Sequence, residues 1–506
     1  MLIGAGNVAS RLLGLVREQV IAALFGATGA TSAFRTATRV STAVYDLLLS
    51  GATTAALVPV FSDYVSAGRT ADLSRVVSTF VNLTFIGLGA IVVVLVVGAP
   101  LLVTALGADA EHFELAVELT RIALPSVMLL GVAGILTAVL YARQTFAIPA
   151  FAGAVYNAGI IIAAVVLVGS LGIHGLALGL ALGAFFQLLV QLPAFRGLHY
   201  QPVVDLHHPG VRLVIQLYTP VFVGMIASYV LVIVDTYLAW QTGPDSVAAM
   251  AFATTLVQFP IGLVGAAASL AILPSLSRMA SDPSPDAQAD FEATLARGLK
   301  MVLLLIVPLA VTLVLLRQPT VSVLFERLAF DAVATQRTSL AVLAYAPQMP
   351  FVVLDQLLIV AFYARKQTLT PVLVGIAGVG VYLAVALVLV VPLGMPGLAL
   401  ANAVQNSAHA AVLFALLSWQ YASLRGAFAG FVLRVVVGGV AAAAGTAIAS
   451  AVLAPWLDSS SLLPRLAAIV GAATVGLVAY WATLVGLRVR EVSEAARILT
   501  RHLPIR

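Results

Sequence analysis

The sequence contains no cysteine and few charged residues. The lack of cysteine excludes disulfide bonds, thiolate metal sites and cysteine nucleophiles. Charged residues occupy 9% of the 506 positions and hydrophobic residues 61%, whereas about 25% of residues are charged in an average soluble domain. Such a chain cannot cover its surface with polar groups. We therefore expect the lipid bilayer to be its solvent.

Long apolar stretches recur along the whole chain. Most are about 20 residues long or longer, which is enough to cross a hydrocarbon core of about 30 Å as a helix. They lie near residues 3–25, 33–61, 77–106, 115–142, 150–169, 174–195, 213–240, 247–276, 299–316, 338–363, 370–391, 397–420, 431–453 and 465–487. The fold class we expect is an all-α polytopic membrane protein with about fourteen transmembrane helices.

Two parts of the chain repeat each other at an offset of 222 positions. The sequence YAR at 141–143 recurs at 363–365 (363 − 141 = 222), and GLAL at 175–178 recurs at 397–400. Coincidence between helices rich in glycine and alanine is the alternative, but the offset holds over many positions and favours duplication. An even number of predicted spans separates the copies, so they share one orientation, as in transporters built from parallel repeats.

The repeat predicts a division of the chain into three parts. The expected parts are a six-helix lobe at 1–200, a second six-helix lobe at 201–425, and two further helices with a basic tail at 426–506. Two lobes that face a central site follow from this arrangement.

The basic residues indicate topology rather than nucleic-acid binding. The net charge is +5, but the arginines and lysines lie mainly in short loops between apolar spans. If the N-terminus is cytoplasmic, most of these loop residues lie inside, and the outer loops carry Arg317, Arg327, Arg337 and Arg465. The positive-inside rule then predicts a multi-pass inner-membrane protein with both termini in the cytoplasm.

Several charges lie inside the first two predicted spans. They are Arg11, Arg17, Glu18, Arg35, Arg39 and Asp46. A charge at mid-bilayer costs roughly 2.5–3.5 kcal/mol or more, so such residues usually face a bundle interior or a wet cavity. Guanidinium groups bind phosphates through paired hydrogen bonds, and the pattern therefore favours an anionic substrate. The alternative is that these arginines extend to an interface or pair with the acids.

Arg11 and Arg17 are the leading candidates for this cavity. Six positions at about 100° each place their side chains roughly 120° apart on a straight helix. Gly14 lies between them. We expect a local break there to turn both side chains toward one substrate.

The N-terminal motifs resemble those of the MurJ (MviN) lipid II flippases. The similar stretches read SRLLGLVRE at 10–18, FGA at 25–27, ATSAF at 30–34 and LVP at 57–59, followed by FP at 259–260 and ILPSLS at 272–277. The resemblance covers essentially the whole chain. It implies membership of the multidrug/oligosaccharidyl-lipid/polysaccharide exporter superfamily and a lipid-facing groove formed by the last two helices. It also implies an undecaprenyl-pyrophosphate-linked peptidoglycan unit as substrate.

The resemblance also implies the substrate-binding positions, which fall on Arg11, Arg17, Ser32, Arg39, Thr255 and Gln258. The family usually has an aspartate where Ser32 stands, and an arginine and a glutamate where Thr255 and Gln258 stand. It also has arginines near Tyr45 and Asp46. Arg11, Arg17 and a basic residue at Arg39 carry over, so a flippase for another lipid-linked glycan stays an alternative.

Asp235 is a candidate ligand for a metal ion. An acid in the seventh predicted span resembles the cation-binding position of some family members, and sodium prefers oxygen ligands. The span near 370–391 offers no Asn or Asp to complete such a cage. A protonatable or hydrogen-bonded structural aspartate is therefore the alternative.

We expect a non-enzymatic transporter. No P-loop, catalytic triad, HExxH motif or dinucleotide-binding glycine pattern is present. The expected partners are a lipid-linked glycan precursor and membrane lipids, with no nucleic acid and no cofactor other than sodium. The predicted mechanism is alternating access across the cytoplasmic membrane. An ion-coupled exporter of small amphipathic compounds is the second hypothesis, and it would need an acidic cavity.

Overall fold

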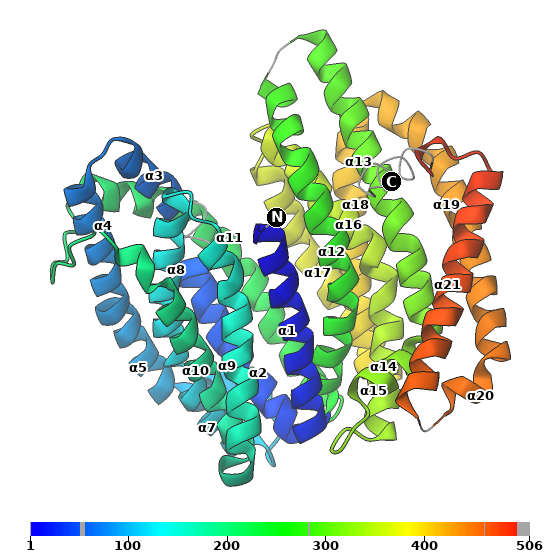
Figure 1. Cartoon of the computed structure of the whole chain (residues 1–506), viewed down its shortest axis with the longest axis horizontal. Helices are drawn as coiled ribbons and strands as arrows, with labels where there is room; N and C mark the ends of the chain where they lie inside the picture. The colour runs from blue at the N-terminus through cyan, green and yellow to red at the C-terminus, as the bar shows by residue number, and fades with distance from the viewer. Residues whose placement is uncertain (1, 51–55, 282–283, 460, 493–506) are drawn as a thin grey trace, which may run out of the picture. The chain divides into compact units, whose positions relative to one another are not determined.

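The structure, a computed structural model, describes residues 2–50, 56–281, 284–459 and 461–492. Over these ranges the chain forms helices and no strand (Figure 1). Eleven segments of the described chain are long and apolar enough to cross a membrane. The all-α polytopic fold is therefore confirmed. The basic tail at 493–506 lies outside the described residues.

The chain divides into two compact units, and the first contains Met1–Ala251 with Arg327–Asp331. Its helices are α1 (Leu2–Phe25), α2 (Gly29–Tyr45), η1 (Asp46–Ser50), α3 (Val58–Ser66), α4 (Thr70–Leu83), η3 (Thr84–Leu88), α5 (Gly89–Val97), α6 (Ala99–Ala105), α7 (Phe113–Ala123), α8 (Ser126–Ala142), α9 (Ala147–Leu171), α10 (Ile173–Gln191), η4 (Leu192–Phe195) and α11 (Pro209–Gln241). Both η1 and η3 are π-helices.

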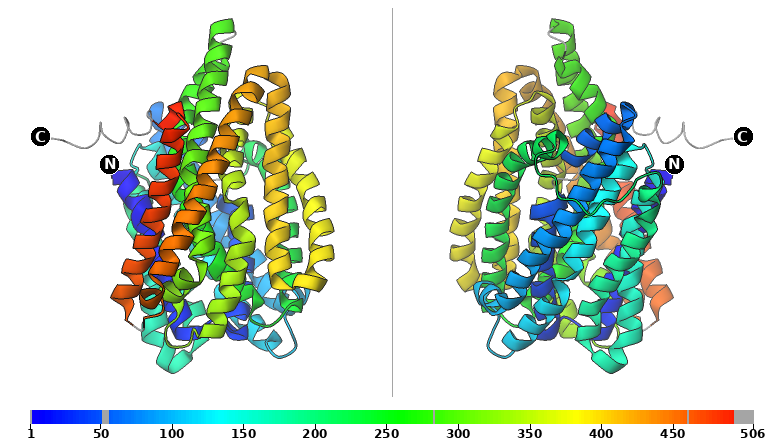
Figure 2. Two further views of the ribbon diagram at one scale, coloured as in Figure 1. Left: turned by 90° about the vertical axis from the view of Figure 1, so that its right-hand side faces the viewer. Right: turned by 90° about the vertical axis from the view of Figure 1, so that its left-hand side faces the viewer.

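The second unit contains Phe252–Glu326 and Ala332–Arg506. Its helices are α12 (Ser246–Ser281, which begins in the first unit), α13 (Pro285–Leu315), α14 (Arg317–Phe325), α15 (Ala332–Tyr345), η5 (Ala346–Gln348), α16 (Met349–Ala364), α17 (Leu369–Leu393), α18 (Met395–Gln420), α19 (Ala422–Val452), α20 (Ala454–Leu457) and α21 (Leu462–Gly486). Within this unit, α19 and α21 pack side by side (Figure 2).

The compact units differ in extent from the lobes that the repeat predicts. Helix α11, expected as the first helix of the second lobe, belongs to the first unit. The indole of Trp240 on α11 donates a hydrogen bond of 3.0 Å to the hydroxyl of Thr36 on α2. Such polar contacts hold α11 against the first unit. The lobe boundaries near residues 200 and 425 stay a prediction made from the sequence repeat.

The repeat recurs in the local structure of the two units. Helices α9 and α17 both begin and end 222 positions apart (369 − 147 and 393 − 171). Each ends at a glycine with positive φ, +52° at Gly172 and +62° at Gly394, a conformation that glycine adopts without steric cost. Pro125 and Pro347, also 222 apart, lie where α7 gives way to α8 and α15 to α16. Proline lacks the N–H that would continue the preceding helix.

Small residues bring α1 close to α9. A Cβ added at Gly6 would lie 2.6 Å from the Cβ of Ala150, and one added at Gly153 would lie 2.5 Å from the hydroxyl of Ser10. Close approach through small side chains is the usual way in which membrane helices pack. This packing fixes α1, the first helix to carry charges, against α9.

The connection at 196–208 is fastened along α4 by a row of polar side chains. The amide Nδ2 of Asn82 donates to the carbonyls of Gln201 and Val203, both at 2.9 Å. The hydroxyl of Tyr200 donates to Asn82 Oδ1 at 2.6 Å. The hydroxyls of Ser74, Ser78 and Thr79 accept backbone N–H groups of the same segment. This loop is therefore part of the first unit.

Candidate functional site

Glu18 is the centre of a charged cluster between α1 and α2. Its carboxylate accepts hydrogen bonds from Arg17 at 2.8 and 3.3 Å and from both terminal nitrogens of Arg35. The Glu18 side chain is 3% exposed. Two guanidinium groups on one buried carboxylate compensate its lost hydration. The pairing alternative that the sequence left open applies to these two arginines.

Arg17 also contacts α9. Its Nη1 donates to Asn157 Oδ1 at 3.0 Å, and Asn157 Nδ2 donates to the carbonyl of Ser10 at 3.2 Å. Asn157 therefore joins the charged cluster to the backbone of α1. The guanidinium is held by Glu18 on one side and by α9 on the other.

Arg39 and Asp46 contact α11. Arg39 Nη1 pairs with Asp235 Oδ2 at 3.5 Å and donates to the hydroxyl of Thr236. The Asp46 carboxylate accepts from the hydroxyl of Tyr229 at 2.7 Å. Arg39 and Asp46 thus both contact α11, whereas Arg35 contacts Glu18 on α1.

Arg11 differs from the other three arginines. It is exposed, and no hydrogen bond or ion pair joins it to the described part of the chain. The charged side chains in this region are Arg11, Arg17, Arg35 and Arg39 against Glu18, Asp46 and Asp235, which leaves a net charge of +1 (4 − 3). The site is thus largely charge-balanced rather than strongly basic.

The expected break near Gly14 is absent. Helix α1 is continuous from Leu2 to Phe25, and a Cβ at Gly14 would meet Asn157 at an ordinary contact distance of 3.7 Å. Because the helix stays regular, Arg11 and Arg17 keep the angular separation of a regular helix. The structure therefore does not turn both residues toward one point.

The uncharged candidates fall into two groups. Ser32 on α2 is buried, and its hydroxyl accepts the backbone N–H of Ala248 at 3.1 Å, so it fastens the start of α12. Thr255 is half-buried and Gln258 is exposed on the part of α12 that belongs to the second unit. Their role in substrate binding stays a prediction.

The carboxylate of Asp235 on α11 pairs with an arginine. One partner of its carboxylate is the guanidinium of Arg39 at 3.5 Å, which would repel a cation. The described residues include no group of three or more His, Cys, Asp or Glu arranged to hold a metal ion. Such an ion pair is what a structural, hydrogen-bonded aspartate makes, and sodium binding at Asp235 stays a prediction.

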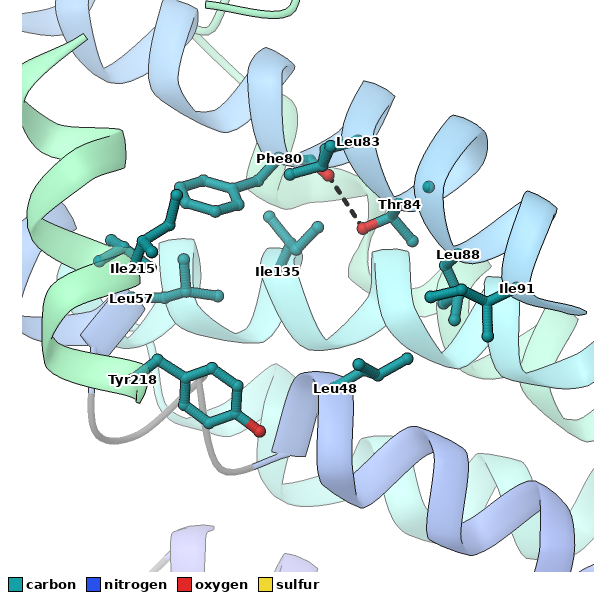
Figure 3. Close-up of a pocket in the computed structure, with 12 residues that line it drawn as sticks. Leu48, Leu57, Phe80, Leu83, Thr84, Leu88, Ile91, Ile135, Ile215 and Tyr218 are labelled. Carbon is teal, nitrogen blue, oxygen red and sulfur yellow. Dashed lines mark hydrogen bonds between the residues drawn. The ribbon is translucent and has the colours of Figure 1, made fainter. Parts of the chain in front are cut away.

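Two apolar pockets lie within the first unit. One of about 280 Å³ is lined by residues of η1, α4, η3, α8 and α11, with Leu48 and Tyr218 opposite Phe80 and Leu83 (Figure 3). The hydroxyl of Tyr218 donates to the carbonyl of Leu47, so its polar end is satisfied. The second, of about 170 Å³, has Arg39 at its wall and is otherwise lined almost wholly by apolar side chains. Such walls suit hydrocarbon rather than a charged head group.

Sequence reasoning missed the partners of the charged residues. Asn157, Tyr229 and Thr236 each bind a charge on α1, α2 or η1. Their positions in apolar spans were the available signal, because a polar side chain in such a span usually has a polar partner. The sequence does not say which one.

Comparisons with known proteins agree on one family. The family model "Lipid II flippase MurJ" matches residues 21–467. "Lipid II flippase MurJ" of Burkholderia cenocepacia is 30% identical over 418 residues, which are 80% of each chain. "Probable lipid II flippase MurJ" of Vibrio cholerae is 30% identical over 513 residues, which cover 98% of this chain and 97% of the relative.

Solved structures give the same fold. The structure described as "Lipid II flippase MurJ, inward closed conformation" has a TM-score of 0.79 at 21% identity and covers 96% of this chain and 99% of its own. An inward-facing MATE family multidrug transporter has a TM-score of 0.71 at 13% identity and covers 82% of this chain and 96% of its own.

The fold is that of a multi-pass, all-helical membrane protein, and the family match makes the chain a transporter rather than an enzyme. Within that class the sequence is more specific, because the family match extends over most of the chain. This chain belongs to the MurJ lipid II flippase family.

Proposed function

We propose that this chain translocates lipid II, the lipid-linked pyrophosphate precursor of peptidoglycan, from the cytoplasmic to the outer leaflet of the bacterial inner membrane. Family membership supports the substrate class. The observation within the structure that carries the proposal is the set of accessible arginines in the first unit. Arg11 is exposed, and the side chains of Arg17 and Arg39 are 27% and 25% exposed although they lie in helices predicted to cross the membrane.

The proposed role of these arginines is to bind the pyrophosphate. A phosphate group accepts two parallel hydrogen bonds from one guanidinium through two of its oxygens, and such bonds strengthen where water is scarce. Arg11 is the first contact, because no ion pair with the described residues has to be broken. Arg17 adds its charge while Glu18 and Asn157 hold its orientation. The isoprenoid tail stays in the hydrocarbon of the bilayer.

The transport cycle we propose is alternating access between two lobes, with both termini in the cytoplasm. The repeated local structure supports lobes of common origin, and parallel-repeat transporters move one lobe against the other. The distribution of loop arginines supports the orientation. Reporter fusions at the two termini test the orientation, and a signal from the outer face at either end contradicts it.

The test of function is translocation of lipid II in vesicles that contain purified protein, measured per inserted molecule. We expect Arg11→Ala and Arg17→Ala to lose flipping and the Lys variants to keep part of it, because lysine retains the charge without the two-pronged geometry. Arg69→Ala, in an exposed ion pair with Asp72, is the matched control and should flip normally. Normal flipping by both Ala variants would show that the arginines do not hold the substrate.

A related lipid-linked glycan is the second candidate substrate. The observation that favours it is the uncharged character of Ser32, Thr255 and Gln258, and in particular the use of the Ser32 hydroxyl as a structural acceptor. Depletion of the protein in its host separates the two. Accumulation of lipid II supports the first substrate, and accumulation of another lipid-linked glycan supports the second.

A further inference from the structure

His409 on α18 is buried between two other helices of the second unit. Its Nδ1 lies 2.7 Å from Asp355 Oδ1 on α16, and its Nε2 lies 3.2 Å from the carbonyl oxygen of Pro371 on α17. The residue is 9% exposed. A Cβ added at Gly375, one turn further along α17, would lie 3.7 Å from Nε2. One imidazole thus connects α16, α17 and α18.

The two contacts fix the number of protons on the pair. A carbonyl oxygen accepts but cannot donate, so the contact with Pro371 requires a hydrogen on Nε2. The contact with Asp355 then needs a second hydrogen, either on Nδ1 or on the carboxyl group. A neutral imidazole with an ionised carboxylate has one hydrogen for two acceptors, so the observed geometry is that of the pair with one proton added.

We propose that Asp355 and His409 form a binding site for one proton, and that this proton is released to solvent and rebound during transport. The part of the proposal that concerns transport rests on the proposed function, whereas the proton site does not. When the proton leaves, the single remaining N–H can serve Asp355 or Pro371 but not both. The imidazole must then release α16 or α17, which gives the second unit two arrangements that differ by one proton.

The surroundings support a site for a proton rather than a metal ion. Asp355 on α16 is the charged group in direct contact with His409. Helix α17 contributes the Pro371 carbonyl and the glycine at 375, and α18 itself contributes the amide of Gln405 near Gly378. Acid and histidine side chains inside membrane spans commonly form proton relays.

The site belongs to one copy of the repeat. The positions 222 residues before Asp355 and His409 are Ala133 and Gln187 (355 − 222 and 409 − 222), neither of which titrates. Duplication alone therefore does not account for the pair. The second unit acquired, or kept, a protonatable contact that the first unit lacks at the corresponding positions.

The decisive variant is Asp355→Asn. Its amide donates a hydrogen to Nδ1 while Nε2–H still donates to Pro371, so the variant reproduces the protonated contacts without an exchangeable proton. Purified protein is titrated between about pH 5 and 9, where histidine pairs change charge, and the protons released per molecule are counted. We expect Asp355→Asn to release one proton fewer than the parent chain.

His174→Asn is the matched control, because His174 also contacts an acid, Glu118, at 2.9 Å but is 37% exposed. Its replacement should leave the effect of Asp355→Asn unchanged. If Asp355→Asn fails to accumulate, the double variant Asp355→Asn with His409→Gln removes both titrating groups and serves the same count. An Asp355→Asn variant that releases as many protons as the parent would overturn the proton site.

Flipping measured in the same vesicles tests the coupling separately. We expect the rate of the parent chain to depend on pH and that of Asp355→Asn to be slower and independent of pH. A lost proton with an unchanged pH profile would refute the coupling but not the site. Absence of flipping in the parent chain would refute the proposed function and leave the proton count standing.

Discussion

Replacement of Glu18 by glutamine tests how much the charged cluster around Glu18 contributes to the stability of the fold. Glu18 is 3% exposed, and its partners Arg17 and Arg35 are 27% and 11% exposed. Removal of one partner from a buried ion pair costs about 3–5 kcal/mol, because the remaining charge stays buried and uncompensated. Glu18→Gln leaves two guanidinium groups facing a neutral amide, so we expect a loss in that range.

The measurement is the free energy of unfolding in detergent, compared with Asp72→Asn. Asp72 pairs with Arg69 at 2.8 Å, but the two side chains are 36% and 57% exposed. Exposed pairs contribute about 0–1 kcal/mol. The two variants should therefore differ by about 2 kcal/mol or more. The double variant Glu18→Gln with Arg35→Gln should recover part of the loss, because it removes one stranded charge. A Glu18→Gln loss no larger than that of Asp72→Asn would refute the reasoning.

Two further predictions concern the loop at 196–208. Asn82→Ala removes three hydrogen bonds to this segment, which are worth about 1 kcal/mol each. Protease cleavage within the segment should therefore become about a hundredfold faster. Replacement of the exposed Ser66 by alanine should leave the cleavage rate unchanged. The second concerns pH: desolvation acts to raise the pKa of Asp205, but the charge of Arg75 and backbone N–H groups hold it below the ordinary value. A carboxyl group whose pKa is lower in the folded than in the unfolded state stabilises the fold at pH values above its unfolded-state pKa of about 3.9. This stabilisation is lost as the pH falls through the lower pKa of the folded state. The difference in melting temperature between the parent chain and Asp205→Asn should therefore vanish under acid conditions.

Much of the fold is predictable because helix formation in a membrane depends on local sequence. The predicted stretch at 150–169 lies within α9, and the stretch at 397–420 matches α18 almost end to end. The offset of 222 positions also predicts the correspondence of α9 with α17. Hydropathy and repetition need no knowledge of which helices are neighbours.

The candidate site is less predictable because it depends on neighbours. The sequence shows that Arg17 and Arg35 need partners, but it does not show that both choose Glu18. The expected break at Gly14 was wrong because a glycine permits distortion without causing it. Likewise, the contact of Arg39 with Asp235 joins positions 196 residues apart, and no periodicity within either helix encodes that distance.

The geometry of the ion pairs ranks the arginines as ligands for an anion. Arg17 is bound to Glu18 by two nitrogens, one at 2.8 Å, whereas Arg39 lies 3.5 Å from Asp235. A phosphate competes more easily for the guanidinium with the longer ion pair, since Coulomb energy falls with distance and a desolvated, doubly bonded pair is costly to separate. Arg11 comes first, Arg39 second, and Arg17 contributes its charge from a fixed position. A substrate bound in this order meets little resistance from the cluster around Glu18, which can therefore hold α1 and α2 together while the substrate enters and leaves.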